Sequence, residues 1–330
     1  LTTRIKDKKC DYVLEELVKA GAPKEIKYEA KPHVGTDILK DVVKNIRKQI
    51  IALGGEVRFS SKLEYIKSKD GKIRSIIVNG EEIPCDALVL ALGHSSRDTY
   101  EMLNDIGIFM EPKAFAIGVR IEHPQEMINV GQYGKMTSHP RLQAASYNLT
   151  YQSKSLGRGI YSFCMCPGGV VVAAASEENR LVSNGMSYHA RDKENSNSAL
   201  VVTVAPDDFE GNSVLRGMEF QRYYEGLAYK VGGGGYKAPV QLLGDFINDR
   251  KSTKLGGVTP SYEPGFEFAD MRQCLPSYVV DAIKEGVGNF DRKIKGYGRE
   301  DAILTGIETR TSAPVKITRN ERLESISLSG

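Results

Sequence analysis

Three polar side chains near the middle of the chain, Tyr188, His189 and Arg191, combine residue types that can move a proton and hold an anion. A histidine has a pKa near neutral pH without help from its surroundings, so it can act as a general acid or base. The arginine could hold a negatively charged group beside a hydride acceptor. The three residues form a candidate catalytic site, but a polar loop between two strands would explain them equally well.

Two cysteines, Cys164 and Cys166, form a second group that could carry chemistry. Side chains two positions apart on a strand point to the same face, so the thiols could form a redox pair or hold a metal. A zinc site normally has Cys-x-x-Cys spacing and a second ligand pair, and the sequence has neither. We therefore expect reduced thiols and no metal.

The composition is that of an ordinary globular protein. The 45 Lys and Arg residues exceed the 42 Asp and Glu residues by three, which is too small an excess to favour nucleic acid or a membrane surface. The longest apolar run, 170–175, is far below the roughly 20 residues of a membrane-spanning helix. We expect a cytoplasmic protein whose five cysteines are reduced.

The first 112 residues are predicted to contain two helices followed by strands. Apolar residues at helical spacing indicate helices over 11–20 and 36–53. Strands are expected at 56–59, 62–68 and 72–78, with tight turns at the Asp-Gly and Asn-Gly pairs. The continuous apolar run 87–92, which ends at Gly93, is typical of a strand buried on both faces of a parallel sheet.

Residues after 112 change in character and predict a mixed antiparallel sheet with helices on one face. The expected strands are 113–122, 159–166, 169–175, 199–205 and 305–317, and the expected helices are 220–231 and 276–287. The fold class that we expect is α/β plus α+β.

Five uncommon strings occur in order along the chain: KPHVGTD at 31–37, GVRIEHPQ at 118–125, FCMCPGG at 163–169, NGMSYHAR at 184–191 and GIETRTSAP at 306–314. In this order and spacing they resemble a bacterial family of FAD-dependent dehydrogenases, also called NAD(P)/FAD-dependent oxidoreductases of the two-dinucleotide-binding flavoprotein superfamily. The resemblance covers essentially the whole chain.

The resemblance implies a domain layout. Members of the family are longer at both ends, so the chain is similar to their central part and lacks the N-terminal G-x-G-x-x-G unit and the C-terminal segment that closes over the flavin. We therefore expect a partial three-layer FAD/NAD(P)-binding domain (1–112), an inserted substrate domain (113–300) and a return into the first domain (301–330).

The resemblance also implies where FAD would lie. Val57 matches a strand residue that contacts adenine through its backbone, although a core valine would fit the sequence equally well. Ala91, Leu92 and Gly93 form a strand end at which the backbone could approach the nucleotide closely.

A polar run, Glu308, Thr309, Arg310 and Thr311, places donors, an acceptor and a fixed positive charge on one predicted strand. This arrangement suits a flavin edge or an anionic substrate. An edge strand with solvated polar faces is the alternative.

These expectations define a function. We expect an FAD-dependent oxidoreductase that transfers a hydride through its flavin to or from a small molecule, with NADH or NADPH as a further electron partner. A non-catalytic module that binds a small molecule or a subunit, and a flavoprotein acting on tRNA, are the alternatives. By itself the chain is expected to be inactive, to hold little FAD and to self-associate.

Overall fold

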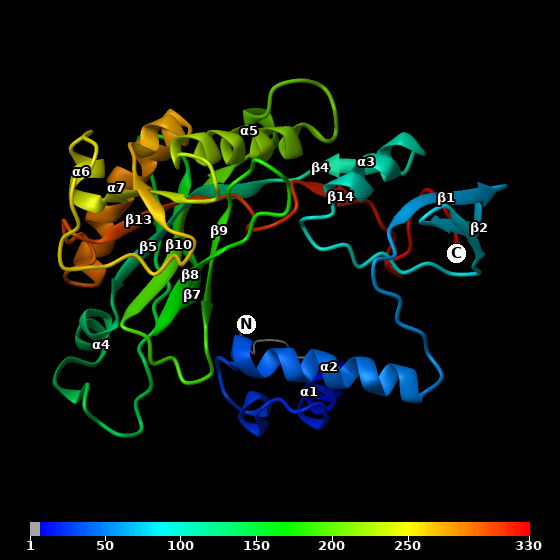
Figure 1. The fold of residues 1–330 in the computed structure, drawn as a ribbon, viewed down its shortest axis with the longest axis horizontal. Helices are drawn as coiled ribbons and strands as arrows, with labels where there is room; N and C mark the ends of the chain where they lie inside the picture. Colours follow the sequence, from blue (N-terminus) through cyan, green and yellow to red (C-terminus); the bar gives the residue numbers. More distant parts are fainter. Residues whose placement is uncertain (1–6) are drawn as a thin grey trace.

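The computed structural model describes residues 7–330, which form a helical unit, a small sheet and a large sheet covered by helices (Figure 1). The α-helices are α1 (Lys9–Lys19), α2 (Thr36–Ala52), α3 (Arg97–Asp105), α4 (Gln125–Tyr133), α5 (Arg216–Val231), α6 (Leu243–Ile247) and α7 (Ser277–Lys293). Short 3-10 helices lie at Lys24–Lys27, Gly134–Met136, Pro206–Asp208 and Met271–Gln273. No helix in the described part of the chain is long and apolar enough to cross a membrane.

The helical unit, residues 9–52, confirms the two helices that the apolar spacing predicts. One stripe of α2, with Ile38, Val42 and Ile46, packs on Leu14 and Leu17 of α1. The apolar cluster of this unit draws only on residues between 14 and 46, so the unit has a small core of its own. Residues 53–62 connect it to the small sheet (Figure 1).

The small sheet contains three antiparallel strands, β1 (Leu63–Lys69), β2 (Lys72–Val78) and β3 (Glu81–Pro84). Asp70 and Asn79 both have positive φ, and each is followed by a glycine with positive φ. This backbone geometry is that of the tight turns that match the twist of a hairpin. The Asp-Gly and Asn-Gly pairs therefore form turns, as predicted.

The large sheet has the strand order β12-β11-β13-β5-β10-β7-β6, and all neighbours are antiparallel except β11 and β12. Its strands are β5 (Phe115–Pro124), β6 (Thr150–Gln152), β7 (Gly159–Cys166), β10 (Asn195–Val204), β11 (Ala238–Leu242), β12 (Phe266–Phe268) and β13 (Ile303–Glu308). The sequence assigns β13 to the returning segment 301–330. In the structure it lies in the middle of this sheet, between β11 and β5.

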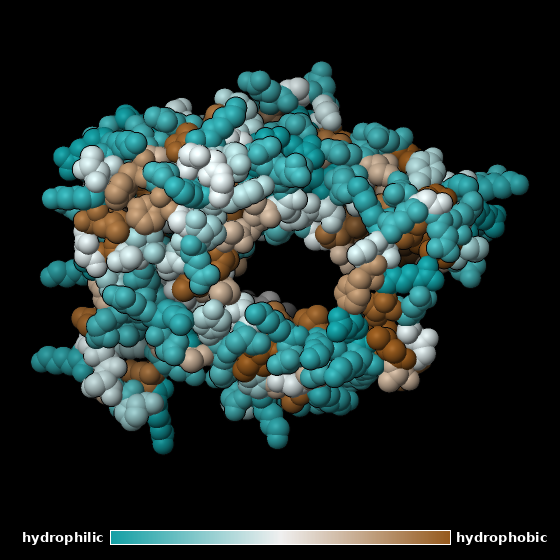
Figure 2. Space-filling view, in the orientation of Figure 1, coloured by the Kyte–Doolittle hydropathy of each residue, from teal (hydrophilic) through white to brown (hydrophobic). Residues whose placement is uncertain are grey.

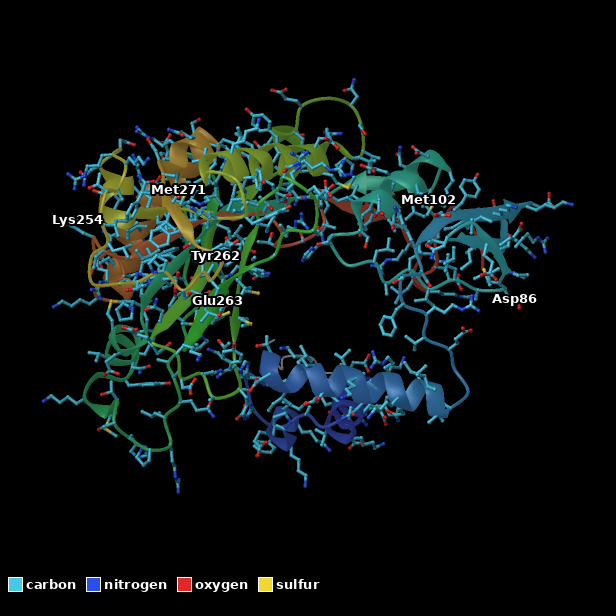
Figure 3. The ribbon with its side chains drawn as sticks, viewed as in Figure 1. Asp86, Met102, Lys254, Tyr262, Glu263 and Met271 are labelled. Atoms are coloured by element: carbon cyan, nitrogen blue, oxygen red, sulfur yellow. The ribbon has the colours of Figure 1, made fainter. Side chains whose placement is uncertain are left out.

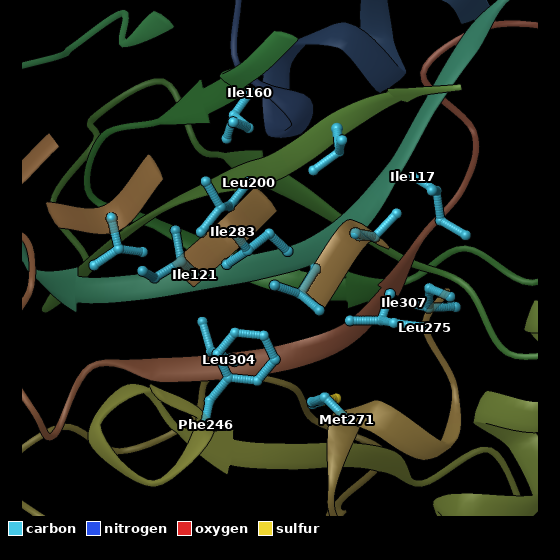
Figure 4. Close-up of a cluster of buried hydrophobic side chains, with 14 of the residues drawn as sticks. Ile117, Ile121, Ile160, Leu200, Phe246, Met271, Leu275, Ile283, Leu304 and Ile307 are labelled. Atoms are coloured by element: carbon cyan, nitrogen blue, oxygen red, sulfur yellow. The ribbon is translucent and has the colours of Figure 1, made fainter. Parts of the chain in front are cut away.

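The main core lies between one face of the large sheet and the helices α5 and α7. Ile121 of β5, Leu200 of β10 and Leu304 of β13 are fully buried there against Ile283 of α7 (Figure 4). Alternate residues of β5 and β10, including Arg120, point to the opposite face. The sheet therefore has an apolar face under helices and a second face that carries polar side chains.

Two short strand pairs complete the fold: β4 (Met110–Pro112) with β14 (Val315–Ile317), and β8 (Gly169–Ala173) with β9 (Ser183–Ser187). Figure 2 shows an opening through the molecule in this view. The helical unit, the β8–β9 side of the large sheet and the small sheet border this opening (Figure 1).

The segment 87–92 is not a strand, which corrects the prediction. It is extended, but within residues 7–330 no strand pairs with it. Leu88, Leu90 and Leu92 pack into the cluster formed by α3 and the small sheet, whereas Val89 is 88% exposed. It runs from Asp86, beside the small sheet, back towards Met102 of α3 (Figure 3). Only one of its two faces is covered by the described residues.

Two further strand predictions differ from the structure. Residues 56–59 lie in the connection 53–62 without strand pairing, so Val57 is not on a strand. The predicted strand 305–317 is divided into β13, which ends at Glu308, and β14, which begins at Val315. Thr309, Arg310 and Thr311 therefore lie in a turn between two sheets, where alternation of faces no longer applies.

Candidate functional site

Two of the predicted cofactor segments meet in the structure, at a loop that follows the extended segment 87–92. Gly93 has φ +66°, and an added Cβ at this position would meet no atom within 4 Å. The loop is fixed from α3, because the Tyr100 hydroxyl donates to the Gly93 carbonyl at 2.9 Å and the Ser96 hydroxyl donates to the Leu92 carbonyl at 2.9 Å.

Arg310, from the turn after β13, connects to this loop. Its Nη1 donates to Ser95 Oγ at 2.9 Å and also to the Ser176 hydroxyl. Its Nη2 pairs with Glu225 Oε2 of α5 at 3.1 Å. The side chain is buried. Arg310 thus holds the Gly93 loop, the turn 309–311 and α5 in one arrangement.

Glu225 is the centre of this buried network. It accepts hydrogen bonds from Arg97 Nη2 at 2.8 Å and from Thr309 Oγ1 at 2.6 Å, in addition to its pair with Arg310. Burial alone would raise the pKa of its carboxyl, but the hydrogen bonds and charges of the two arginines outweigh burial and hold the pKa below its usual value. Arg97 also pairs with Glu177. Both guanidinium groups at this site are therefore neutralised by carboxylates.

A second polar cluster lies on the other face of the large sheet, where the β8–β9 pair packs against it and buries Arg120, Asn197 and Glu308. Arg120 Nη2 donates to the Cys164 carbonyl at 3.0 Å and lies 3.7 Å from Cys166 Sγ, and its Nη1 lies 3.5 Å from Glu308 Oε2. Burial raises the pKa of the Glu308 carboxyl despite this arginine. The amide nitrogen of Asn197, beside Arg120, is buried without a hydrogen-bond partner.

The cysteines lie at an irregularity of β7. Cys164 has φ +44°, and the register between β10 and β7 shifts at this point, so the two side chains are not related by regular alternation. Cys164 is exposed and Cys166 is partly buried, and all five cysteines are free thiols.

The predicted catalytic residues lie elsewhere, where the loop after β9 meets the helical unit. The Tyr188 carbonyl accepts a hydrogen bond from His33 Nε2 at 3.0 Å, and His189 Nδ1 donates to the Val34 carbonyl at 3.0 Å. The backbone N–H of His189 donates to Asp37 Oδ1 at 2.9 Å. These contacts, together with the Thr36 hydroxyl bonded to the Ser187 carbonyl, are called the clasp below. The clasp joins the helical unit to the large sheet.

A comparison with protein families agrees with the positions of these elements. A family model described as FAD-dependent protein, C-terminal domain-like, matches residues 114–311, which is more than half of the chain. The chain belongs to this family. The matched range begins at β5 and ends directly after β13, so the family domain corresponds to the large sheet with its helices and includes Arg310.

Two other comparisons give different amounts of information. A protein of Clostridium beijerinckii, described only as uncharacterized, is 72% identical over all 330 residues, and the chain spans 62% of the length of that protein. The crystal structure of CtdE in complex with FAD and substrate 4 is 14% identical, covers 55% of this chain and 37% of its own, and has a TM-score of 0.25. A TM-score this low supports no conclusion about fold or cofactor.

The residues of this family member fit FAD in part. The backbone at 91–93 is open, and Gly93 leaves room for close approach of a nucleotide. The negative charge of a diphosphate is not met at this loop, because Arg97 and Arg310 are already paired with Glu225. The described residues therefore fit backbone contacts to the cofactor, but not its phosphates.

The structure brings together only some of the predicted cofactor residues. Ala91, Leu92 and Gly93 lie next to the loop that Arg310 contacts. Thr311 bonds instead to the backbone of Ala116, and Glu308 faces Arg120. The sequence analysis considered a strand with alternating polar faces and a solvated edge strand for this segment. Both are wrong, because residues 309–311 form a turn in which Thr309 and Arg310 are buried.

Sequence reasoning missed two important residues. Glu225 lies on the buried side of α5, at helical spacing from Met218, Gln221 and Ala228. A glutamate among buried positions of an amphipathic helix is a signal for an ion-pair network, and it could have been noticed. His33 was contained in one of the five strings, but nothing in the sequence pointed to its partner 155 residues away.

Proposed function

We propose that this chain is part of an FAD-dependent dehydrogenase that acts on a small molecule, with NADH or NADPH as a further electron partner. Membership of an FAD-dependent family supports the cofactor. The contact of Arg310 with Ser95 supports a location for the cofactor. This contact joins the family domain to the loop at Gly93, where the backbone is open. When bound, FAD would accept and pass on a hydride.

The chain's own residues have positioning roles in this proposal. The backbone at 91–93 would contact the cofactor, and the Arg310–Glu225 pair would hold that backbone against the large sheet. Arg120 and Glu308 are buried between the large sheet and the β8–β9 pair, so their ion pair would stabilise this arrangement rather than contact a substrate. The free thiols fit a cytoplasmic protein.

A visible spectrum of the purified, longer Clostridium beijerinckii protein tests the proposal. We expect flavin absorbance that is bleached by NADH or NADPH without oxygen. A colourless protein that does not bind added FAD would contradict the proposal. The 330-residue chain should hold little FAD, because Arg97 and Arg310 are already neutralised; one FAD per chain would refute this account.

Two glycines provide a matched pair of variants in the longer protein. Gly93 and Gly107 lie at opposite ends of α3, both have positive φ, and both have open space around an added Cβ. Alanine at either position should strain the backbone to a similar extent, by about 1 kcal/mol. We expect only Gly93→Ala to weaken FAD binding. Equal weakening by Gly107→Ala would show that the effect is one of stability.

A further inference from the structure

The clasp is next to an arginine, Arg191, for which the described residues supply no ion-pair partner. Arg191 is partly buried, and among residues 7–330 no carboxylate forms an ion pair with it. Its Nη1 makes only a long contact, 3.4 Å, to the neutral Gln143, and its Nε is buried without a hydrogen-bond partner. Buried or half-buried charges are normally paired, so this guanidinium has unused capacity for an anion.

The backbone holds Arg191 in place. Its φ is +52°, an uncommon conformation for a residue with a side chain. The Arg191 carbonyl lies so close to Gly168 that an added Cβ on that glycine would be 1.8 Å from it. Such a conformation persists only where the surrounding structure enforces it, and it is frequent in ligand-binding regions. The side chain is therefore presented from a fixed backbone.

Two imidazole rings accompany this arginine. The His33 and His189 rings are stacked at 6.2 Å with an angle of 4°. Each ring uses one nitrogen for a backbone carbonyl, so His33 Nδ1 and His189 Nε2 have no hydrogen-bond partner among the described residues. Burial lowers the pKa of His33, and the positive charges of Arg191 and His189 lower it further. The Tyr188 carbonyl accepts hydrogen bonds both from His33 Nε2, at 3.0 Å, and from the backbone N–H of Arg191, at 3.2 Å, so the His33 ring lies beside the turn that carries Arg191.

The surrounding charges also favour an anion. Lys31 lies on the same segment as His33, and its Nζ donates to the neutral Ser146 Oγ at 3.1 Å. Lys193 lies over the Tyr188 ring at 5.2 Å. Of the nearby acids, Asp37 is engaged by the His189 backbone, and Glu29 acts on Arg191 only through its charge.

We propose that Arg191, with His33 and His189, binds the carboxylate of a small organic acid. A single planar guanidinium presents two parallel N–H groups that match the two oxygens of a carboxylate. Because the His33 and His189 rings border the turn that carries Arg191, their signals would respond to the charge of a bound carboxylate. This inference deepens the proposed function, on which it rests for the role of the acid as substrate.

The test follows the histidine ring signals of the 330-residue chain by NMR. The chain has five histidines, so signals labelled at Cε1 can be assigned with His33→Gln and His189→Gln. Sodium acetate is titrated at constant ionic strength, with acetamide as the uncharged match and inorganic phosphate as the competing anion. We expect saturable shifts of the His33 and His189 signals with acetate and none with acetamide.

Variants separate binding from folding. Arg191→Met should weaken acetate binding by about tenfold or more, and Arg191→Lys, which keeps the charge but loses the fork, should weaken it less. Arg141→Met, an exposed arginine on the neighbouring loop, is the matched control and should leave binding unchanged.

Three outcomes would overturn the inference: no saturable shift in the unchanged chain, a shift that persists in Arg191→Met, or saturation by phosphate at lower concentration than acetate. The test does not depend on flavin. If the longer protein is yellow but the 330-residue chain does not respond to acetate, only the acid site is rejected. If the chain binds acetate but the longer protein is colourless, only the dehydrogenase proposal is rejected.

Discussion

His123, at the end of β5, should make the stability of this protein depend on pH. The ring is fully buried, its Nε2 donates to the Tyr297 carbonyl at 2.7 Å, and its Nδ1 has no hydrogen-bond partner. Burial lowers the pKa of His123 to about 4, from a usual value of 6.5. The folded protein therefore keeps this ring neutral at pH values where the unfolded chain protonates it.

The sign and size of the effect follow from linkage. Between these two pKa values the unfolded state binds more protons, so the contribution to stability is complete above the unfolded pKa and is lost as the pH falls towards the folded pKa. For pKa values of 6.5 and about 4, the free energy of unfolding at pH 5 is about 2 kcal/mol lower than at pH 7 from this residue alone.

Urea unfolding of the unchanged protein and of His123→Gln, each at both pH values and followed by circular dichroism, isolates this term. Glutamine can still donate to the Tyr297 carbonyl but does not titrate in this range. The raised pKa values of buried Glu122 and Glu308 affect both proteins equally, so they cancel in the difference. A stability difference between the two proteins that is the same at both pH values would refute the reasoning.

Three further predictions concern single residues. Arg310→Ala should lower the free energy of unfolding by about 3–5 kcal/mol, because it leaves a buried carboxylate short of a partner; Arg180→Ala, outside the ion pairs found in the described part, should change it by about 0.5 kcal/mol, and equal losses in urea would contradict the network. Gly185→Ala should lower Tm, because the added Cβ would lie 2.0 Å from a guanidinium nitrogen of Arg120. Gly288→Ala, on the open surface of a helix, should raise Tm, and a higher Tm for Gly185→Ala than for Gly288→Ala would contradict this account. Cys164, the exposed thiol, should react first with a disulfide reagent, and metal analysis should find no stoichiometric zinc or iron.

Elements with local signals could be predicted from the sequence. The helices at 9–19 and 36–52, the hairpin turns and most strands of the large sheet depend on spacing and turn residues that are close together in the chain. The segment 87–92 was wrongly predicted as a strand because pairing is not local. Its apolar pattern indicates burial, but it contains no information on which strands lie beside it.

The site could be predicted only as residue types. The sequence predicts a polar site at 309–311, yet the partners of this turn, Glu225 and Ser95, lie far away in the sequence. Tyr188, His189 and Arg191 were predicted as one group. The structure shows that two of them use their backbone or ring for the clasp, and that the Nε of Arg191 is buried without a hydrogen-bond partner. Such division of tasks depends on tertiary contacts.

The contacts of the clasp are polar, and they join two parts of the chain that are also connected covalently. Residues 53–62 keep the helical unit attached to the small sheet even when the clasp is open. A covalent connection of this kind keeps the effective concentration of the two partners high, so contacts too weak to hold separate molecules can re-form. Opening here exposes little apolar surface, since the helical unit keeps its own core. Opening of the clasp would therefore leave both the helical unit and the large sheet folded.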